Sequence, residues 1–398
     1  MRILVLTFAF AMTVAATPAI AQITKAPPTQ TTNRILKIET MAKKLNHPWG
    51  LAFLPDGRVL LTERPGRMRI LGKDGKLSKA LGGVPAVYTS EQGGLLDVVL
   101  DPEFTASGMI YFTYAEPRGR GRSATTVARA RLTLQGDTGR LDAVQVIFRQ
   151  DPAYASIGAF GSRLVFMPDA SLFISLGDRD TPRQQAQNPG NHLGKLVRIF
   201  SDGRPHADNP KHDGWRSEIW SIGHRNVQAA AINPTSGELW IVEHGPRGGD
   251  EINIPQAGKN YGWPIITYGI DYDLRKIGAG TAKPGLEQPI YYWDPSIAPS
   301  GALFYTGDLF PEWKANLFVS ALAGEALHRL VLDGEKVVGE EVLLKEFGER
   351  MRNVRQGPDG AIWLLTDHSR GQVLRMVPSP TTGCATDDVF FIPKKQAC

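Results

Sequence analysis

The chain has 398 residues, 42% of them hydrophobic and 21% charged, which is enough apolar material to bury a large core. Its 45 Lys and Arg exceed its 40 Asp and Glu, giving a formal net charge of +5. No concentrated basic run accompanies this excess, which argues against nucleic-acid binding. The excess fits a small anionic ligand, with no particular role as the alternative.

The N-terminus has the features of a secretory signal. Residues 1–21 place Arg2 before an apolar run that ends in Ala-Ile-Ala, so we expect cleavage after Ala21. A membrane anchor is the alternative, but the run is short and is broken by Pro18. No later segment is long and apolar enough to cross a bilayer. We expect an exported protein, periplasmic or secreted, with a flexible leader at 22–32.

Residues 33–380 contain a recurring unit, in which a hydrophobic stretch, a proline-centred turn and a β-rich run ending in a polar residue follow one another. Each unit reads as two short strands joined by a turn. The turn prolines of the six units are Pro55, Pro102, Pro168, Pro234, Pro311 and Pro358. Six units predict an all-β fold, a six-bladed β-propeller whose loops converge around a central channel. A pair of β-sandwiches is the alternative.

Two stretches, 178–200 and 267–301, interrupt this pattern as long polar or aromatic insertions, and such loops on a rigid scaffold often have a function. The tail, 381–398, contains the two cysteines of the chain, Cys384 and Cys398. In an oxidising compartment they would close one small disulfide loop, with two free thiols as the alternative.

A glycine-rich loop after a hydrophobic run, IVEHGPRGGDEIN, is a candidate metal site. It brings Glu243, Asp250 and Glu251 close to Gly245 and Pro246. Carboxylate and carbonyl oxygens on a backbone that turns freely suit a hard cation such as calcium, although the spacing is not that of an EF-hand.

Arginines stand at equivalent places in the repeats. Arg225 and Asn226 precede the fourth turn unit, and Arg350 and Arg352 precede the last. Strand alternation predicts that Arg350 and Arg352 share a face, where their planar donor forks would form an anion cradle. Solvated arginines on an edge strand are the alternative.

Two further residues are weaker candidates. Gln92 precedes a Gly-Gly turn and an apolar strand, where its amide would point toward the channel, and Trp293 offers a flat face to a planar ligand. Aromatic clusters are more often core. Zinc-binding, Walker, GxSxG and kinase motifs are not found.

In this order the motifs resemble the soluble quinoprotein aldose dehydrogenases, the family of sugar dehydrogenases that depend on pyrroloquinoline quinone (PQQ). The resemblance runs through nearly the whole mature chain, in HPWGLAFLPDG, QGGLLDVVLDPEF, FGSRLVF, NHLGKLVRI, EIWSIGHRNVQ, EHGPRGGDEIN, GKNYGWP, YYWDPSIAPSG and RQGPDGAIWLLTD. It implies a six-bladed propeller that binds PQQ and Ca²⁺, oxidises the anomeric carbon of a sugar to a lactone and passes electrons to an external acceptor.

The resemblance also assigns roles to individual residues. It implies that the carbonyls of Gly245 and Pro246 hold calcium, and that Gln92 and Arg225 lie at the reacting centre. Trp293 resembles the aromatic residue that lines the sugar site. The cofactor contacts that it implies are Arg225, Asn226, Arg350 and Arg352.

Two positions depart from the family pattern. Ala159 stands where the family has a histidine that acts as general base, and losing such a base costs roughly 10²- to 10⁴-fold in rate. Ala323 stands where some members have a cofactor-binding lysine.

The departures leave other functions open. Three candidates for a replacement base are His224, His244 and Glu91, none of them aimed by the sequence. A propeller that binds a sugar without turning it over and a calcium-dependent lactone hydrolase are the alternative functions.

Overall fold

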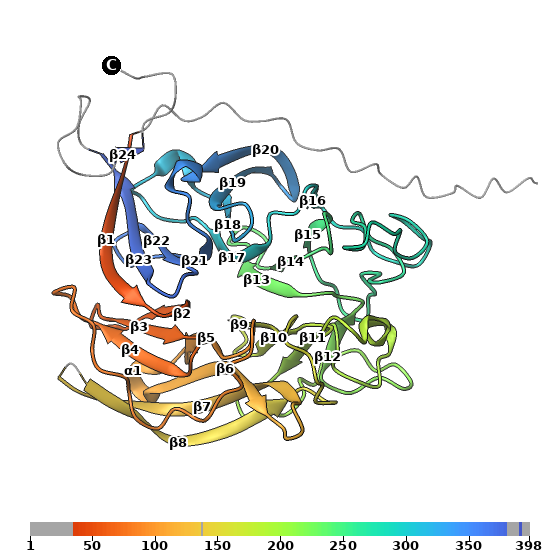
Figure 1. The fold of residues 1–398 in the computed structure, drawn as a ribbon, viewed down its shortest axis with the longest axis horizontal. Coiled ribbons are helices and arrows are strands. Elements are labelled where there is room, and N and C mark those ends of the chain that lie inside the picture. The colour runs from red at the N-terminus through yellow and green to blue at the C-terminus, as the bar shows by residue number, and fades with distance from the viewer. Residues whose placement is uncertain (1–34, 137, 380–389, 392–398) are drawn as a thin grey trace, which may run out of the picture.

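The computed structural model describes residues 35–136, 138–379 and 390–391, and these form six antiparallel sheets arranged in a ring (Figure 1). The prediction of an all-β, six-bladed propeller is confirmed, and the pair of sandwiches is excluded. The expected signal peptide and leader, together with Cys384 and Cys398, lie outside the described residues. Among the described residues, no helix is long and apolar enough to cross a membrane.

The blades follow one another along the chain. Blade 1 comprises β2 (Pro48–Phe53), β3 (Val59–Glu63) and β4 (Arg67–Leu71). Blade 2 comprises β5 (Leu95–Leu100), β6 (Met109–Pro117), β7 (Ser123–Gln135) and β8 (Thr138–Arg149). Blade 3 comprises β9 (Gly161–Phe166), β10 (Leu172–Leu176), β11 (Lys195–Ile199) and β12 (Ile219–Ile222). Blade 4 comprises β13 (Val227–Ile232), β14 (Leu239–Glu243), β15 (Asp250–Asn253) and β16 (Tyr291–Trp293). Blade 5 comprises β17 (Pro299–Phe304), β18 (Leu317–Ala321), β19 (Ala326–Asp333) and β20 (Lys336–Leu343).

Blade 6 joins the two ends of the described chain. It comprises β21 (Met351–Gln356), β22 (Ile362–Thr366), β23 (Gly371–Pro378), β1 (Leu36–Leu45) and β24 (Phe390–Phe391). Strand β1 pairs with β23, Leu36 lying opposite Pro378 and Leu45 opposite Gly371. Because the first strand completes the last blade, hydrogen bonds close the ring.

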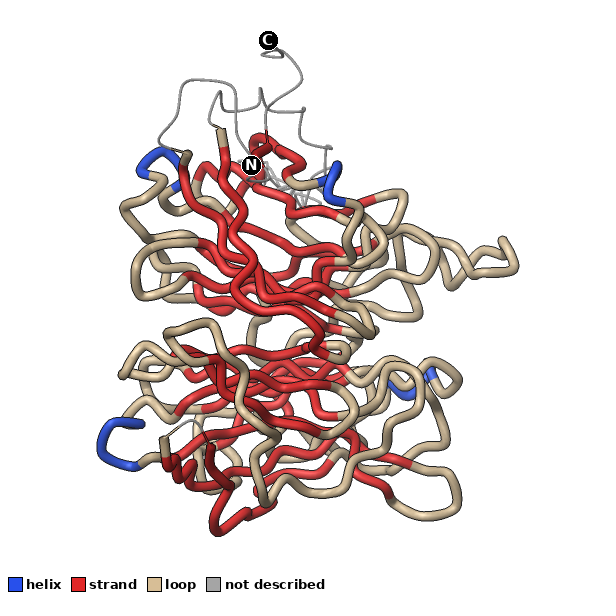
Figure 2. Tube along the Cα trace, turned by 60° about the vertical axis from the view of Figure 1, so that its left-hand side comes forward, coloured by secondary structure: helices blue, strands red, loops and turns tan. Residues whose placement is uncertain are grey.

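Helical turns are few and lie at the periphery (Figure 2). They are α1 (Phe104–Ser107) and three 3₁₀ turns, at Arg183–Gln187, Pro311–Trp313 and Lys345–Phe347. Five of the six second strands, β3, β10, β14, β18 and β22, are buried along their whole length. Their continuous apolar runs are typical of strands covered on both faces, here by the neighbouring blades.

All six turn prolines lie between the first and second strand of a blade, as the repeat pattern predicts. These turns therefore share one face of the ring. The starts of the innermost strands and the ends of the second strands share the opposite face, which we call the site face. The innermost strands β2, β5, β9, β13, β17 and β21 contact one another in succession around the channel.

Candidate active site

Four of the predicted site residues stand just before an innermost strand. Gln92 precedes β5, Arg225 and Asn226 precede β13, and Arg350 precedes β21. Because these strands all begin at the site face, the fold brings residues from three blades to one end of the channel.

Two hydrogen bonds link predicted site residues to the segment that precedes β9. Gln92 Oε1 accepts from the backbone N–H of Ala159 at 3.0 Å, and Asn226 Oδ1 accepts from that of Gly161 at 3.0 Å. Blades 2 and 4 therefore both hold the segment in which the family histidine is expected. Ala159 itself is buried and has no proton acceptor in its side chain.

Arg350 and Arg352 do not share a strand face as alternation predicts. The register of β21 against β22 is irregular between Met351 and Asn353. As a result Arg350 is exposed, with Nη1 donating to Leu322 O at 3.3 Å, whereas Arg352 is buried. Ala323, next to Leu322, is exposed and adds no cation.

Arg352 has a counter-charge within the protein. Its Nη2 lies 2.5 Å from Asp367 Oδ2, and its Nη1 donates to Gln228 Oε1 at 2.8 Å. Burial opposes ionisation of Asp367, but Arg352 and the hydrogen bond from His47 hold the pKa of this carboxyl well below its usual range. The carboxylate is therefore ionised at neutral pH.

Two guanidinium donors at this end of the channel have no hydrogen-bond partner. Nε of Arg352 and Nε of Arg64 are buried and form no hydrogen bond, although both arginines are attracted by the charge of the Asp367 carboxylate. Buried polar atoms of this kind usually have a partner, so these two donors are available to an anion. Sequence reasoning missed Arg64 and Asp367. The signal was present, because both directly follow the second strand of a blade, as His244 does.

Arg225 faces the glycine-rich loop. Its Nη1 donates to Gly245 O at 2.7 Å and to His244 O at 3.2 Å, and its guanidinium lies over the Trp263 ring at 5.4 Å. The arginine thus meets the carbonyl that the resemblance assigns to calcium.

Two carboxylates of this loop accept hydrogen bonds that stabilise its conformation. Glu243 accepts from the backbone N–H of Arg225 at 2.7 Å and contacts His224 Nδ1 at 3.0 Å. Asp250 accepts from the backbone N–H groups of Gly245, Ile297 and Ala298 at 2.7–2.8 Å. These bonds fix the loop against the connection between β16 and β17.

Glu251 lies opposite Glu243 across the β14–β15 pair. Burial and the neighbouring charge of Glu243 raise the pKa of Glu251 well above its usual range. Among the described residues, no group of three or more His, Cys, Asp or Glu side chains is arranged to hold a metal ion. Hydrogen bonds with Arg225 and His224 engage Glu243, and backbone N–H groups engage Asp250. The expectation that Glu243, Asp250 and Glu251 ligate calcium together stays a prediction.

The prediction that Trp293 lines a sugar site is wrong. Trp293 is in the outermost strand of blade 4, is 4% exposed and packs in the core beside Tyr291 and Ile297. Its Nε1 donates to Glu340 Oε1 at 2.7 Å, across to blade 5. The aromatic run therefore belongs to the interface between blades.

Neither candidate histidine is placed to act as a base. His224 is fully buried between Glu243 and Ser221 Oγ, with both ring nitrogens engaged. His244 Nε2 contacts Pro299 O at 2.7 Å. Burial and the charges of Arg225, Arg352 and Arg350 lower the pKa of His244 to about 3.

A cavity of about 320 Å³ opens beside Arg225 at the site face. Its lining includes Asp178, Asp180, Pro246, Trp263 and Tyr272. The two inserted segments form much of the wall and are joined where Arg183 Nη1 lies 2.7 Å from Asp271 Oδ2. Burial raises the pKa of Asp178 to about 6, although the charge of Arg225 opposes the shift. The volume suits a small organic ligand.

Comparison with known proteins agrees with this geometry. The family model described as Glucose / Sorbosone dehydrogenase matches residues 45–375. The aldose sugar dehydrogenase YliI of Escherichia coli (strain K12) is 45% identical over 348 residues, covering 86% of this chain and 93% of the relative. The soluble aldose sugar dehydrogenase of Escherichia coli, solved in the apo-form, has a TM-score of 0.83 at 45% identity, covering 86% of this chain and 100% of that one.

A solved structure with bound cofactor is also similar. The PQQ-bound form of the aldose sugar dehydrogenase from Streptomyces coelicolor has a TM-score of 0.73 at 28% identity, covering 87% of this chain and 99% of that one. Because the family model spans most of the propeller, the chain belongs to the Glucose / Sorbosone dehydrogenase family.

Proposed function

We propose that the protein oxidises the anomeric carbon of an aldose to a lactone with PQQ as cofactor and passes the electrons to an external acceptor. The observation that carries the proposal is the pair of buried, unpartnered guanidinium donors, Arg64 Nε and Arg352 Nε, at the site face. A similar protein has been solved with PQQ bound.

The residues present fit PQQ, which is a tricarboxylate. Guanidinium forks match carboxylates in geometry and charge, and Arg350 is exposed at the same face. Arg225, Asn226, Arg350, Arg352 and Arg64 would hold the cofactor. When bound, PQQ supplies a two-electron acceptor. The arginines would orient the cofactor and stabilise negative charge close to it.

Calcium is part of the proposal, held by the carbonyls of Gly245 and Pro246. Pro246 lines the cavity, and Asp250 fixes the loop by accepting from Gly245 N at 2.8 Å. Carbonyl oxygens on a fixed backbone suit a hard cation. Since Arg225 Nη1 donates to Gly245 O, calcium would replace the guanidinium at this oxygen.

One observation favours a second candidate function. Ala159 supplies no base, so a propeller that binds PQQ and sugar without turnover is the alternative. The support for action outside the cytoplasm comes from the N-terminal sequence alone.

Titration of the purified apoprotein with PQQ, followed by absorbance, tests the cofactor assignment. We expect saturable binding in calcium and much weaker binding in EGTA. Absence of PQQ binding in calcium would remove the proposed function, whereas equal binding in EGTA would remove only the calcium.

A further inference from the structure

We propose that Asp180 is the general base that accepts the proton of the anomeric hydroxyl, in place of the histidine missing at Ala159. The inference rests on the proposed function and names the residue that would make turnover feasible without that histidine.

The carboxylate of Asp180 lies against the segment that contains Ala159. A Cβ placed on Gly158 would collide with Asp180 Oδ2 and would lie 3.4 Å from Gln92 Cδ. Asp180 and Gln92 therefore approach Gly158 from the side on which a side chain would project. Glycine at 158 leaves room for an acidic group beside the position of the expected base.

Asp180 is also open to the cavity beside Arg225. It lines the cavity of about 320 Å³ together with Arg225 and Pro246, and the residue is exposed. A base must come within hydrogen-bond reach of the proton that it removes, so exposure to the cavity is a requirement. Asp180 meets this requirement.

The backbone around Asp180 is held in an uncommon conformation. Arg179 and Asp180 have φ values of 63° and 61°, in the left-handed region that few non-glycine residues adopt. The backbone N–H of Asp180 donates to Asp178 Oδ1 at 2.8 Å, which turns the chain back on itself. Consecutive residues of this kind persist where surrounding contacts determine them, often at functional sites.

Arg179 provides those contacts. Its guanidinium is buried and donates to Gly158 O at 3.1 Å, Ser156 O at 2.6 Å and Ser123 O at 3.0 Å, and it lies 3.9 Å from the Phe160 ring centre. One side chain thus ties the loop carrying Asp180 to the segment carrying Ala159. Their relative position is fixed before any ligand binds, as catalysis requires.

Asp178, the other acid of the cavity, is less suited to the role. It is fully buried, and both of its carboxylate oxygens already accept, from Trp263 Nε1 at 2.7 Å and from Asp180 N at 2.8 Å. Asp178 therefore acts as a positioning residue, whereas the carboxylate of Asp180 is the one exposed to the substrate.

The step balances in protons and electrons. The anomeric O–H bond breaks and its proton passes to a carboxylate oxygen of Asp180. The anomeric C–H bond breaks and its electron pair leaves with the hydrogen, as hydride, to the quinone acceptor of the proposed function. The C–O bond becomes the lactone carbonyl, and the proton on Asp180 is later released to solvent.

The first test compares Asp180→Asn with the unaltered protein, each reconstituted with calcium and PQQ. We expect kcat for aldose oxidation to fall roughly 10²- to 10⁴-fold, as for loss of a general base, while PQQ affinity by titration stays unchanged. Asp202→Asn removes an exposed carboxylate that pairs with Arg204 in the same turn and is the matched control, expected to keep its activity. Retained turnover in Asp180→Asn, or loss in Glu91→Gln instead, would overturn the inference.

A binding measurement provides a readout that does not depend on turnover. An iminosugar with its ammonium group at the anomeric position should bind the reconstituted protein at least tenfold more tightly than it binds Asp180→Asn, by calorimetry. Equal affinities would contradict the placement of Asp180 at the anomeric centre. If the unaltered protein binds no PQQ, the proposed function fails. If it binds PQQ and Asp180→Asn turns over normally, only the assignment of Asp180 fails.

Discussion

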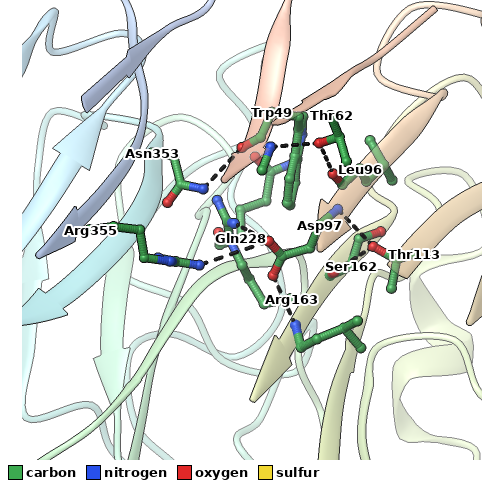
Figure 3. Close-up of polar contacts among 12 residues, drawn as sticks. Trp49, Thr62, Leu96, Asp97, Thr113, Ser162, Arg163, Gln228, Asn353 and Arg355 are labelled. Atoms are coloured by element: carbon green, nitrogen blue, oxygen red, sulfur yellow. Dashed lines mark hydrogen bonds and ion pairs between the residues drawn. The ribbon is translucent and has the colours of Figure 1, made fainter. Parts of the chain in front are cut away.

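Arg163 and Asp97 form an ion pair in the centre of the channel, with 3.0 Å between Nη1 and Oδ1 and almost no exposure of either side chain (Figure 3). Arg163 belongs to blade 3 and Asp97 to blade 2, and the guanidinium also donates to Gln228 O in blade 4 and lies 4.0 Å from the ring centre of Trp49 in blade 1. Its Nη2 also donates to Ser300 O in blade 5 and to Arg352 O in blade 6, so one arginine contacts all six blades beneath the site face.

Removing Asp97 should destabilise the whole propeller. Burial lowers the pKa of Arg163 to about 9, so the guanidinium remains charged at neutral pH and would lose its counter-ion. Stranding one member of a buried pair costs about 3–5 kcal/mol, and we expect Asp97→Ala to lower the free energy of unfolding by that amount in urea. For the exposed pair of Asp202 and Arg204, Asp202→Ala should cost less than about 1 kcal/mol. Equal costs would refute the central role of the channel pair.

Ionisation of Glu340 should make the stability of the interface between blades 4 and 5 depend on pH. Although burial opposes it, hydrogen bonds from His328 and Trp293 lower the pKa of Glu340 to about 2 from 4.5. A depressed pKa in the folded state stabilises the fold above pH 4.5, and this contribution is lost as the pH falls toward 2. It amounts to roughly 3 kcal/mol.

Unfolding of Glu340→Gln at several pH values tests this statement. The unaltered protein should be more stable than the variant by a constant margin between pH 5 and 7, and the margin should shrink between pH 4.5 and 2. A margin that does not change with pH would show that Glu340 is not the titrating group.

Arg350 should contribute to cofactor affinity and little to stability. Its side chain is exposed, and the hydrogen bond seen for it, to Leu322 O, is long at 3.3 Å. A charged hydrogen bond to a PQQ carboxylate would contribute about 1.5–3 kcal/mol, so Arg350→Gln should weaken PQQ binding by roughly 10- to 100-fold.

The thermal unfolding midpoint of the Arg350→Gln apoprotein should match that of the unaltered protein. Arg204→Gln, which changes an arginine in an exposed turn, is the matched control and should leave PQQ affinity as it is. An unchanged affinity in Arg350→Gln would place the cofactor elsewhere on the site face.

The propeller could be predicted because its repeat is local. Each turn proline is followed by a short apolar run, and the spacing of these units is visible along the chain without knowledge of contacts. The pairing of β1 with β23 could not be read in this way, because Leu36 and Pro378 are more than 300 residues apart in the sequence. From the sequence, closure of the ring could be inferred only from the number of repeated units.

The site was predicted less completely, because side-chain direction depends on tertiary contacts. The family resemblance implies that Trp293 lines the sugar site, but Glu340 of the next blade holds its indole in the core. Strand alternation predicts that Arg350 and Arg352 share a face, but the register of β21 against β22 is irregular at this point, so the prediction fails. No sequence pattern indicates Asp180 as a base, because its position depends on the buried contacts of Arg179 with a segment more than 20 residues earlier in the chain.

Dye reduction by the purified protein, reconstituted with calcium and PQQ and supplied with a panel of aldoses, is the most direct test of the proposed function. We predict reduction that depends on PQQ and on at least one aldose, despite alanine at position 159. Saturating PQQ binding without reduction by any aldose would contradict the dehydrogenase assignment and would favour a propeller that only binds its ligands.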